Sequence, residues 1–493
     1  MQAPGSRARA GDRGRLFLTA LLVYAVFVNP VLLNPMTWSA LDTAVSLVET
    51  GRWQVAHGDL YGDMDVALSG SRKVAGPPPA MAAMLVPAYV AWRAVAGTVD
   101  GLEAFAAFHV FATLLIGATA SALAAGEVAA LAGWLGASRM GRLWAALLFA
   151  FGTPAFLFAT RLFKENVAAL AVIVAFRLAV DEGGPARRAL SGLVAGLAAL
   201  VAYPAGLIGP GLAAIIASRD GRGALGAFTA GWVPPLAALA GYNAWLFGRP
   251  WRFAYATYLN LPEAAPTVGW RAPDLSVLLN SLVHQREGLL LYSPFLVLGA
   301  VGLAALWWEG RRLPAAVVVA FTLALWALSA AWLARFPSAF TGARYLFAAV
   351  PLLAACAGPV LERASAGVRW ALAGASVGLT YLTVQAGHIA DPAPLVYAVK
   401  TFLSGGGLPV LFKETLPAWL GIETLHTMLG HAEVTARDVI ALLAAPAGWR
   451  LALNQVLVAA VAAVVFLSLA WVIRRLWTQP DAAAATASPA LAP

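Results

Sequence analysis

The sequence predicts an all-α integral membrane protein, a bundle of about twelve transmembrane helices with short helices in its first external loop. Of the 493 residues, 61% are hydrophobic and only 12% are charged, and the mean hydropathy is +0.76. A soluble domain carries about 25% charged residues. Apolar runs recur at about the twenty residues that a helix needs to cross a bilayer, whereas strands of a membrane barrel would alternate in polarity and cross in about ten.

The chain begins with a basic segment, 1–15, and a first apolar run, 16–33, without a small-residue cleavage site. We therefore expect a cytoplasmic tail followed by an uncleaved first helix. The single cysteine, Cys356, lies in an apolar run, which excludes an intrachain disulfide and a cysteine metal site. The net charge of +9 comes largely from arginines at helix ends, which indicates membrane orientation and not nucleic-acid binding.

Arginine pairs in the short polar breaks set the predicted orientation, because short cytoplasmic loops are rich in basic residues. The pairs are Arg139 and Arg142, Arg187 and Arg188, Arg219 and Arg222, Arg311 and Arg312, Arg363 and Arg369, and Arg474 and Arg475. The spans that keep every pair inside are 16–33, 104–133, 141–160, 165–181, 189–203, 204–218, 224–247, 288–308, 313–333, 344–361, 370–387 and 451–473. Both ends of the chain are then cytoplasmic.

Two apolar stretches are predicted not to cross the membrane in the usual way. The stretch 77–97 would invert the following arginine pairs if it crossed, so we expect a re-entrant or surface-lying helix on the outer face. The run 189–218 is broken at Tyr203 and Pro204 and is expected to form two short helices that meet at the outer side.

This orientation places the candidate functional segments on one external face. They are the first loop (34–103), the turn 161–165, the loop 248–287, the turn 334–343 and the segment 388–450. We expect 16–387 to form the catalytic module, 388–450 to form a lid or acceptor region, and 474–493 to be a disordered cytoplasmic tail because of its low complexity.

Acidic residues near the first and second external turns are candidate catalytic groups. Asp42 follows the first helix, where a carboxylate close to the bilayer must be solvated, paired or functional. The alternative is an interfacial helix whose Asp42 faces water. Glu165 opens a helix, where the helix dipole alone would favour a carboxylate without any catalytic role.

Basic residues on the same face are candidate phosphate ligands. Arg72 and Lys73 precede a proline-rich entry into an apolar stretch, and basic groups at an interface suit the phosphate of a bulk lipid or of a bound substrate. Arg344 opens a helix at its positive end, where a cation is disfavoured unless it has an anionic partner. That partner is either a phosphate or a carboxylate.

Other polar and aromatic residues allow weaker interpretations. A divalent-metal site built from His57, Asp59, Asp63 and Asp65 is the less favoured alternative to a solvated acidic loop, because the spacing fits no defined motif. Glu127 is an intramembrane carboxylate toward the cytoplasmic half, and its role is left open. Aromatic residues of the outer side could stack on sugar rings or belong to the interfacial belt. They are Trp38, Trp53, Trp251, Trp270 and Trp332.

Seven segments, in order over about residues 20 to 360, resemble the GT-C superfamily of membrane glycosyltransferases, which includes protein mannosyltransferases and aminoarabinose transferases. They are LDTAVSLVETGRW, SRKVAGPPPAMAAMLVPAYV, ATRLFKENVAAL, LVAYPAGLIGP, YNAWLFGRPWRFAY, REGLLLYSPFLVL and TGARYLFAAVPLL. The sequence departs from the superfamily's pattern at Thr43, Pro79 and Asn166, where relatives carry a second acid, a glycine and a proline.

The resemblance implies a GT-C-like fold and an inverting glycosyltransferase of the bacterial plasma membrane that works on the external face. Its donor is a sugar on a polyprenyl phosphate, and its acceptor is a hydroxyl of a lipid or glycan. In this interpretation Asp42 is the general base, and Glu165 orients the acceptor or tunes Asp42. Arg72, Lys73 and Arg344 hold the phosphate.

Tyr292, Arg286 and Trp38 are implied substrate contacts, and no cofactor is implied. Two alternatives stay open. One is a lipid-linked-sugar flippase or transporter, and the other is a non-catalytic partner subunit that binds polyprenyl lipid.

Overall fold

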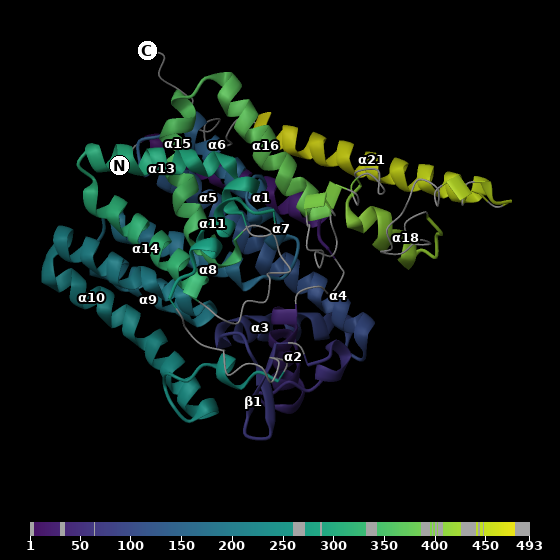
Figure 1. Ribbon diagram of the computed structural model, residues 1–493, viewed down its shortest axis with the longest axis horizontal. Coiled ribbons are helices and arrows are strands. Elements are labelled where there is room, and N and C mark those ends of the chain that lie inside the picture. The colour runs from purple at the N-terminus through teal and green to yellow at the C-terminus, as the bar shows by residue number, and fades with distance from the viewer. Residues whose placement is uncertain are drawn as a thin grey trace, which may run out of the picture.

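The computed structural model describes residues 4–29, 35–63, 65–259, 272–285, 288–331, 343–385, 408–424 and 448–478, with parts of 395–402 and 440–446. Over these residues the fold is a helical bundle with one two-stranded sheet (Figure 1). The predicted all-α membrane architecture is confirmed. Among the described residues, six helices are long and apolar enough to cross a membrane, and the total number of crossings stays a prediction.

Most helices of the first half follow the predicted spans, but α1 begins at Pro4 inside the predicted tail 1–15 and ends at Val26, before the end of the predicted span 16–33. The helices of this half are α1 (Pro4–Val26), α2 (Pro35–Thr50), α3 (Pro79–Ala96), α4 (Leu102–Ala112), α5 (Thr119–Trp134), α6 (Arg139–Phe151), α7 (Pro154–Ala159), α8 (Lys164–Val180), α9 (Pro185–Val201) and α10 (Ile208–Phe247). A π-helical turn, Thr113–Ala118, joins α4 to α5, so Leu102–Trp134 is one continuous apolar helix.

The second half adds shorter helices and two further long ones. They are α11 (Leu275–Val283), α12 (Leu289–Tyr292), α13 (Val297–Trp308), α14 (Arg312–Ala331), α15 (Val350–Arg363), α16 (Ala366–Gln385), α18 (Leu416–Trp419) and α21 (Gly448–Thr478). The 3₁₀ helix Arg344–Ala349 leads directly into α15. Of the predicted lid segment, the part 408–424 packs against α21 through Phe412 and Val458. Most of the rest of 388–450 lies outside the described residues.

The predicted break in the run 189–218 is present. The 3₁₀ turn Tyr203–Leu207 separates α9 from α10, because the proline ring of Pro204 cannot continue the helical hydrogen bonding of α9. A second break lies at Gly221, whose φ of 82° is non-helical and divides α10 between Arg219 and Arg222. This division matches the predicted boundary between the spans 204–218 and 224–247.

A β-hairpin in the first loop is the main difference from the expected helical loop. β1 (Val66–Ser69) pairs antiparallel with β2 (Arg72–Ala75), with Val66 opposite Ala75. Ala67 also forms a bridge to Tyr258, and the Leu259 N–H donates to the Val66 carbonyl at 2.9 Å. Backbone hydrogen bonds therefore join the first loop to the loop that follows α10. Strands of four residues carry too little alternation to be recognised from sequence.

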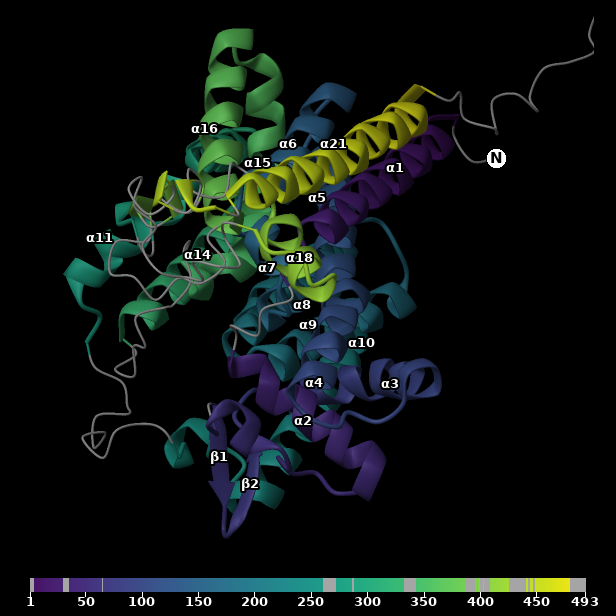
Figure 2. The same ribbon diagram turned by 90° about the vertical axis from the view of Figure 1, so that its right-hand side faces the viewer.

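The hairpin lies with α2 and α3 at one end of the bundle, which we call the hairpin end. Figures 1 and 2 place these elements together, opposite the end that carries α6 and α16. α3 packs against α2, but α3 is also long and apolar enough to cross a membrane, so the surface-lying or re-entrant position of the stretch 77–97 stays a prediction. Of the segments that the sequence predicts to be external, the first loop therefore lies at this end, whereas α11 and α18 lie away from it (Figures 1 and 2).

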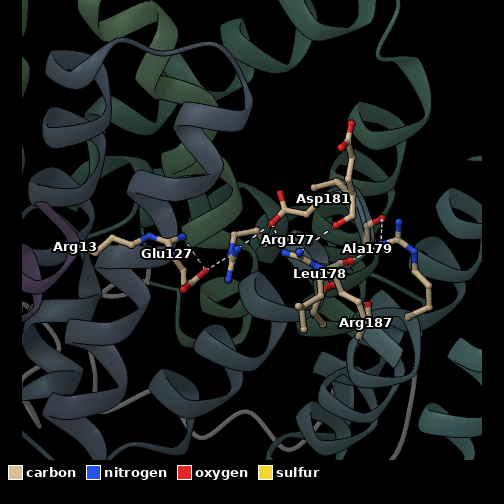
Figure 3. Close-up of polar contacts among 12 residues, drawn as sticks. Arg13, Glu127, Arg177, Leu178, Ala179, Asp181 and Arg187 are labelled. Atoms are coloured by element: carbon tan, nitrogen blue, oxygen red, sulfur yellow. Dashed lines mark hydrogen bonds and ion pairs between the residues drawn. The ribbon is translucent and has the colours of Figure 1, made fainter. Parts of the chain in front are cut away.

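Glu127 belongs to an ion-pair network away from the hairpin end (Figure 3). Its carboxylate pairs with Arg177 of α8 and lies 3.8 Å from Arg13 of α1. Arg177 also pairs with Asp181 at 2.9 Å, and Asp181 pairs with Arg187 at 2.5 Å. Asp181 follows the last residue of α8, so the network ties helices together at the end of α8 opposite Glu165. A paired carboxylate at membrane depth is stabilised without any catalytic role.

Candidate active site

Asp42 lies on α2 and is fully buried. Its Oδ1 accepts hydrogen bonds from the Ala56 N–H at 3.1 Å and contacts His57 Nδ1 at 2.9 Å. Its Oδ2 accepts from the His57 N–H at 2.7 Å and from the Tyr61 hydroxyl at 3.0 Å. A carboxylate has about four lone-pair sites, so all of them are occupied. The carboxylate of Asp42 therefore fastens the segment 56–61 onto α2.

The hydrogen bonds of Asp42 bear on its predicted role as the group that removes a substrate proton. A general base must reach the proton it abstracts at about 2.6–3.2 Å. In this structure both oxygens of Asp42 face protein donors and the side chain is shielded from solvent. Asp42 thus orients His57 in this structure, and its role as general base stays a prediction.

His57 and Asp42 form a charge-assisted pair at the edge of this packing. The His57 side chain keeps 36% of its surface exposed, while that of Asp42 has none exposed. The hydrogen bond to Asp42 raises the pKa of His57, against the opposing effect of partial burial, and the charges of Asp42, Asp59 and Asp100 raise it further. The imidazolium form of His57 is therefore favoured in the folded state.

Replacing His57 by glutamine is expected to lower stability more at pH 6 than at pH 8.5. The folded-state pKa of His57 is raised, so its stabilising charge is fully present below the unfolded pKa, about 6.5, and is lost as the pH rises through the folded value. Thermal unfolding of His57→Gln and wild type at both pH values measures the effect. In an Asp42→Asn background the pH-dependent difference should disappear, and its persistence there would contradict the pairing.

Glu165 and Arg344 form a second pair at the same end of the bundle. Glu165 lies in the first turn of α8 and Arg344 opens the 3₁₀ helix before α15. Their side chains are buried, and the Arg344 Nε lies 3.7 Å from Glu165 Oε1. Arg344 also donates to the Tyr345 hydroxyl at 3.1 Å. The anionic partner predicted for Arg344 is thus a carboxylate in this structure, and none of the described contacts joins Glu165 to Asp42.

Asp65 and Lys164 complete this group of charges. Lys164 is buried beside Glu165 at the start of α8. Burial raises the pKa of the Asp65 carboxyl, while the Lys164 ammonium, the Tyr258 hydroxyl and the Arg344 guanidinium lower it. These interactions place Asp65 within electrostatic range of both cations and of Glu165. We refer to Asp65, Lys164, Glu165, Tyr258 and Arg344 as the charged cluster.

Gly76 leaves room for the Tyr258 ring beside the charged cluster. A Cβ atom at this position would lie 2.1 Å from the Tyr258 ring, so a larger residue would displace the tyrosine. The Gly76 N–H donates to the Asp65 carbonyl at 2.9 Å, which connects the end of β2 to the residue before β1. Tyr255 and Tyr258 stack edge to face with ring centroids 5.2 Å apart. The loop after α10 therefore supplies aromatic residues beside Asp65.

The other predicted phosphate ligands do not join the charged cluster. Lys73 and Arg72 lie on β2 and are exposed, and the Lys73 ammonium pairs with Asp63 at 2.5 Å. Within the described part of the chain, no hydrogen bond or ion pair links Lys73 to Arg344. A role for Arg72 and Lys73 in phosphate binding stays a prediction.

The predicted substrate contacts are largely packed inside the protein. Trp38 is buried and meets the Tyr61 ring edge to face at 5.5 Å, so it is not a free surface for a sugar ring. Tyr292 is buried, donates to the Gln285 carbonyl and accepts at its own carbonyl from Thr380. Arg286 lies outside the described residues.

Across the part of the chain that the structure describes, no three His, Cys, Asp or Glu side chains are grouped so as to hold a metal ion. Of the four residues in the metal alternative, His57 is paired with Asp42 and Asp63 is paired with Lys73. Asp65 interacts with the other members of the charged cluster. The dependence of this protein on a metal stays untested.

Sequence reasoning missed Lys164, Tyr258 and the position of Asp65 among these charged groups. Lys164 could have been found from sequence, because a cation in the first turn of a helix opposes the helix dipole in the same way as Arg344 does. Nothing in the local sequence distinguishes Asp65, since its charged neighbours are about one hundred or more residues away in sequence. Tyr258 becomes a neighbour of Asp65 only through the strand contact to β1.

Together the fold and the site define a multi-pass helical membrane protein with a charged cluster at the hairpin end. Among solved structures the chain is similar to ArnT from Cupriavidus metallidurans in the apo state, with a TM-score of 0.49 and 16% identity over 91% of this chain and 76% of that one. It is also similar to the same protein bound to undecaprenyl phosphate, with a TM-score of 0.49 and 15% identity over 92% of this chain and 76% of that one.

A third similar structure is the Archaeoglobus fulgidus oligosaccharyltransferase in the apo form, with a TM-score of 0.44 and 15% identity over 79% of this chain and 55% of that one. These similarities concern the fold alone. No protein-family model matches the chain, and no curated protein matches it in sequence.

Proposed function

We propose that the protein is an inverting glycosyltransferase that moves a sugar from a polyprenyl phosphate to an acceptor hydroxyl at the hairpin end. The observation that carries the proposal is the charged cluster. Two buried cations, Lys164 and Arg344, lie with two carboxylates, Asp65 and Glu165, where three separate chain segments meet. Buried ionisable groups of both signs at one end of a membrane bundle are costly unless they are paired or bind a charged substrate.

The cations suit the leaving group of this reaction. When the bond between the anomeric carbon and the phosphate oxygen breaks, the electron pair stays on the oxygen and the phosphate gains negative charge. A guanidinium and an ammonium that are already in place stabilise that charge without reorganisation. Arg344 and Lys164 are the residues that we assign to this role, with Glu165 holding Arg344 in position at 3.7 Å.

The carboxylates suit the acceptor. The attacking hydroxyl must lose its proton as the new bond to the anomeric carbon forms, and a general base accelerates such a step by about 10²–10⁴-fold. A phosphate is a good leaving group and needs no general acid. The reaction therefore requires one carboxylate as base and cations for the phosphate, a composition that the charged cluster provides.

The test is transfer and donor binding by the purified protein in lipid nanodiscs. Radiolabelled sugars on undecaprenyl phosphate are offered with a bacterial membrane extract as the source of acceptors. We expect label in the acceptor fraction, and at least a tenfold weaker binding of the donor by Arg344→Gln. Arg93→Gln is the matched control, because Arg93 also pairs with a glutamate, Glu49 at 3.4 Å, but on an exposed surface of α3.

Binding of the donors with no transfer to any acceptor would favour a lipid-handling function over an enzyme. Equal loss of donor binding in Arg344→Gln and Arg93→Gln would remove the charged cluster as the phosphate site. No donor binding by the wild type would contradict the proposed function altogether.

A further inference from the structure

The backbone holds Asp65 in a demanding conformation within the charged cluster. Its φ of 59° lies in the left-handed region, which costs energy for most residues and is tolerated best by glycine, asparagine and aspartate. Its carbonyl accepts the Gly76 N–H at 2.9 Å, and the next residue, Val66, begins β1. The position of the Asp65 side chain is thus set by the hairpin, and unusual backbone geometry of this kind is concentrated at functional sites.

The Asp65 side chain is the least satisfied carboxylate of the group. Asp65 is half-buried as a residue, but its Oδ2 is shielded from solvent and has no well-formed hydrogen bond to any described residue. The Tyr258 hydroxyl lies close enough to this carboxyl to lower its pKa, but it too makes no well-formed hydrogen bond to a described residue. Burying polar atoms without hydrogen-bond partners is unfavourable, so these two atoms are suited to bind a polar group from outside the protein chain.

The neighbouring carboxylates are already committed to protein partners. Asp42 accepts from three backbone and side-chain donors and contacts the His57 ring. Glu165 pairs with Arg344, and Asp63 pairs with Lys73. Asp63 also has a buried oxygen without a hydrogen bond, but its carboxylate pairs with Lys73, whereas Asp65 lies near the cations Lys164 and Arg344. Asp65 is therefore the carboxylate of this region that combines an unmatched buried oxygen with a place among the cations.

From this geometry we propose that Asp65 is the general base that accepts the proton of the acceptor hydroxyl, an inference that rests on the proposed glycosyl transfer. The hydroxyl oxygen attacks the anomeric carbon as its proton passes to Asp65 Oδ2. The bond between that carbon and the phosphate oxygen breaks, and its electron pair leaves with the polyprenyl phosphate beside Lys164 and Arg344. The Tyr258 hydroxyl donates to the acceptor oxygen and positions it.

The electrostatics of the site agree with this role. Burial raises the pKa of Asp65, which strengthens it as a base, while Lys164, Tyr258 and Arg344 lower it and Glu165 raises it. Tyr255 faces the same carboxyl from the loop after α10. A base acts in its ionised form, so the transfer rate should rise with pH through the raised pKa of Asp65 and level off above it.

The decisive comparison is between Asp65→Asn and Asp63→Asn. Both positions have left-handed backbones, at φ 59° and 53°, and asparagine tolerates that region, so each change removes a charge without changing the shape. Asp63 pairs with Lys73 on the hairpin and lies outside the charged cluster. We expect Asp65→Asn to lose about 10²–10⁴-fold in the transfer rate constant and to bind the undecaprenyl-phosphate sugar as wild type does. Asp63→Asn should keep a rate close to wild type.

The pH profile separates chemistry from structure. The residual transfer by Asp65→Asn should lack the rise with pH that wild type shows, a change that a merely structural role would not produce. If wild type transfers the sugar and Asp65→Asn does so at the same rate, or with the same pH profile, this inference is overturned and the proposed function is not. Loss of donor binding in Asp65→Asn also overturns it, since the residue then serves the donor. Failure of wild type to bind any donor overturns the proposed function as well.

Discussion

Replacing Arg344 by alanine is expected to reduce the free energy of unfolding by about 3–5 kcal/mol, the cost of leaving a buried charge without its partner. Arg344 and Glu165 are 5% and 8% exposed, and their side chains approach to 3.7 Å. Without the guanidinium, the Glu165 carboxylate stays in a poorly solvated position. Thermal unfolding in detergent measures the loss, and reaction of a fluorogenic maleimide with the only thiol, Cys356, reports it because that side chain is buried.

The double variant Arg344→Gln with Glu165→Gln separates stability from binding. Both charges are removed together, so we expect much of the lost stability to return while phosphate binding stays weak. Arg93→Ala is the control for stability, because its exposed pair with Glu49 is worth about 0–1 kcal/mol. Similar unfolding temperatures for Arg344→Ala and Arg93→Ala would contradict the buried pairing.

Replacing Asp42 by asparagine is expected to release the segment 51–61 from α2. In asparagine an NH2 group replaces one of the two acceptor oxygens, and its N–H groups face the N–H and O–H donors of the protein. At least one of the Ala56, His57 and Tyr61 groups therefore loses its acceptor. Each buried donor left unmatched costs about 1–3 kcal/mol. Hydrogen exchange followed by mass spectrometry should show faster exchange in 51–61, together with a lower unfolding temperature.

Asp59→Asn is the matched control for this change, because Asp59 lies in the same segment but is exposed. It should exchange as wild type does. If Asp42→Asn exchanges normally in 51–61 and yet abolishes transfer, Asp42 acts in the chemistry as the superfamily resemblance implies, and the positioning role assigned from its hydrogen bonds is wrong.

Local pattern was sufficient to locate most of the helices. The predicted span 165–181 corresponds to α8, Lys164–Val180, and 313–333 corresponds to α14, Arg312–Ala331. The break at Tyr203 and Pro204 was also visible, because proline acts on its own neighbours. A crossing helix must be apolar along its whole length and satisfies its backbone hydrogen bonds internally. Its position can therefore be predicted from a run of consecutive residues.

The sequence by itself therefore determined the membrane class, most of the helix boundaries and the grouping of Glu165 and Arg344 with the first loop. The tertiary structure alone decided which partners each charged residue contacts. It occupies Asp42 with donors from 56–61, pairs Arg344 with Glu165 and brings Tyr258 and Lys164 to Asp65. These partners lie up to about 190 residues apart in the chain. The residues next to a carboxylate in sequence do not show whether a distant cation, a hydroxyl or a backbone N–H will contact it.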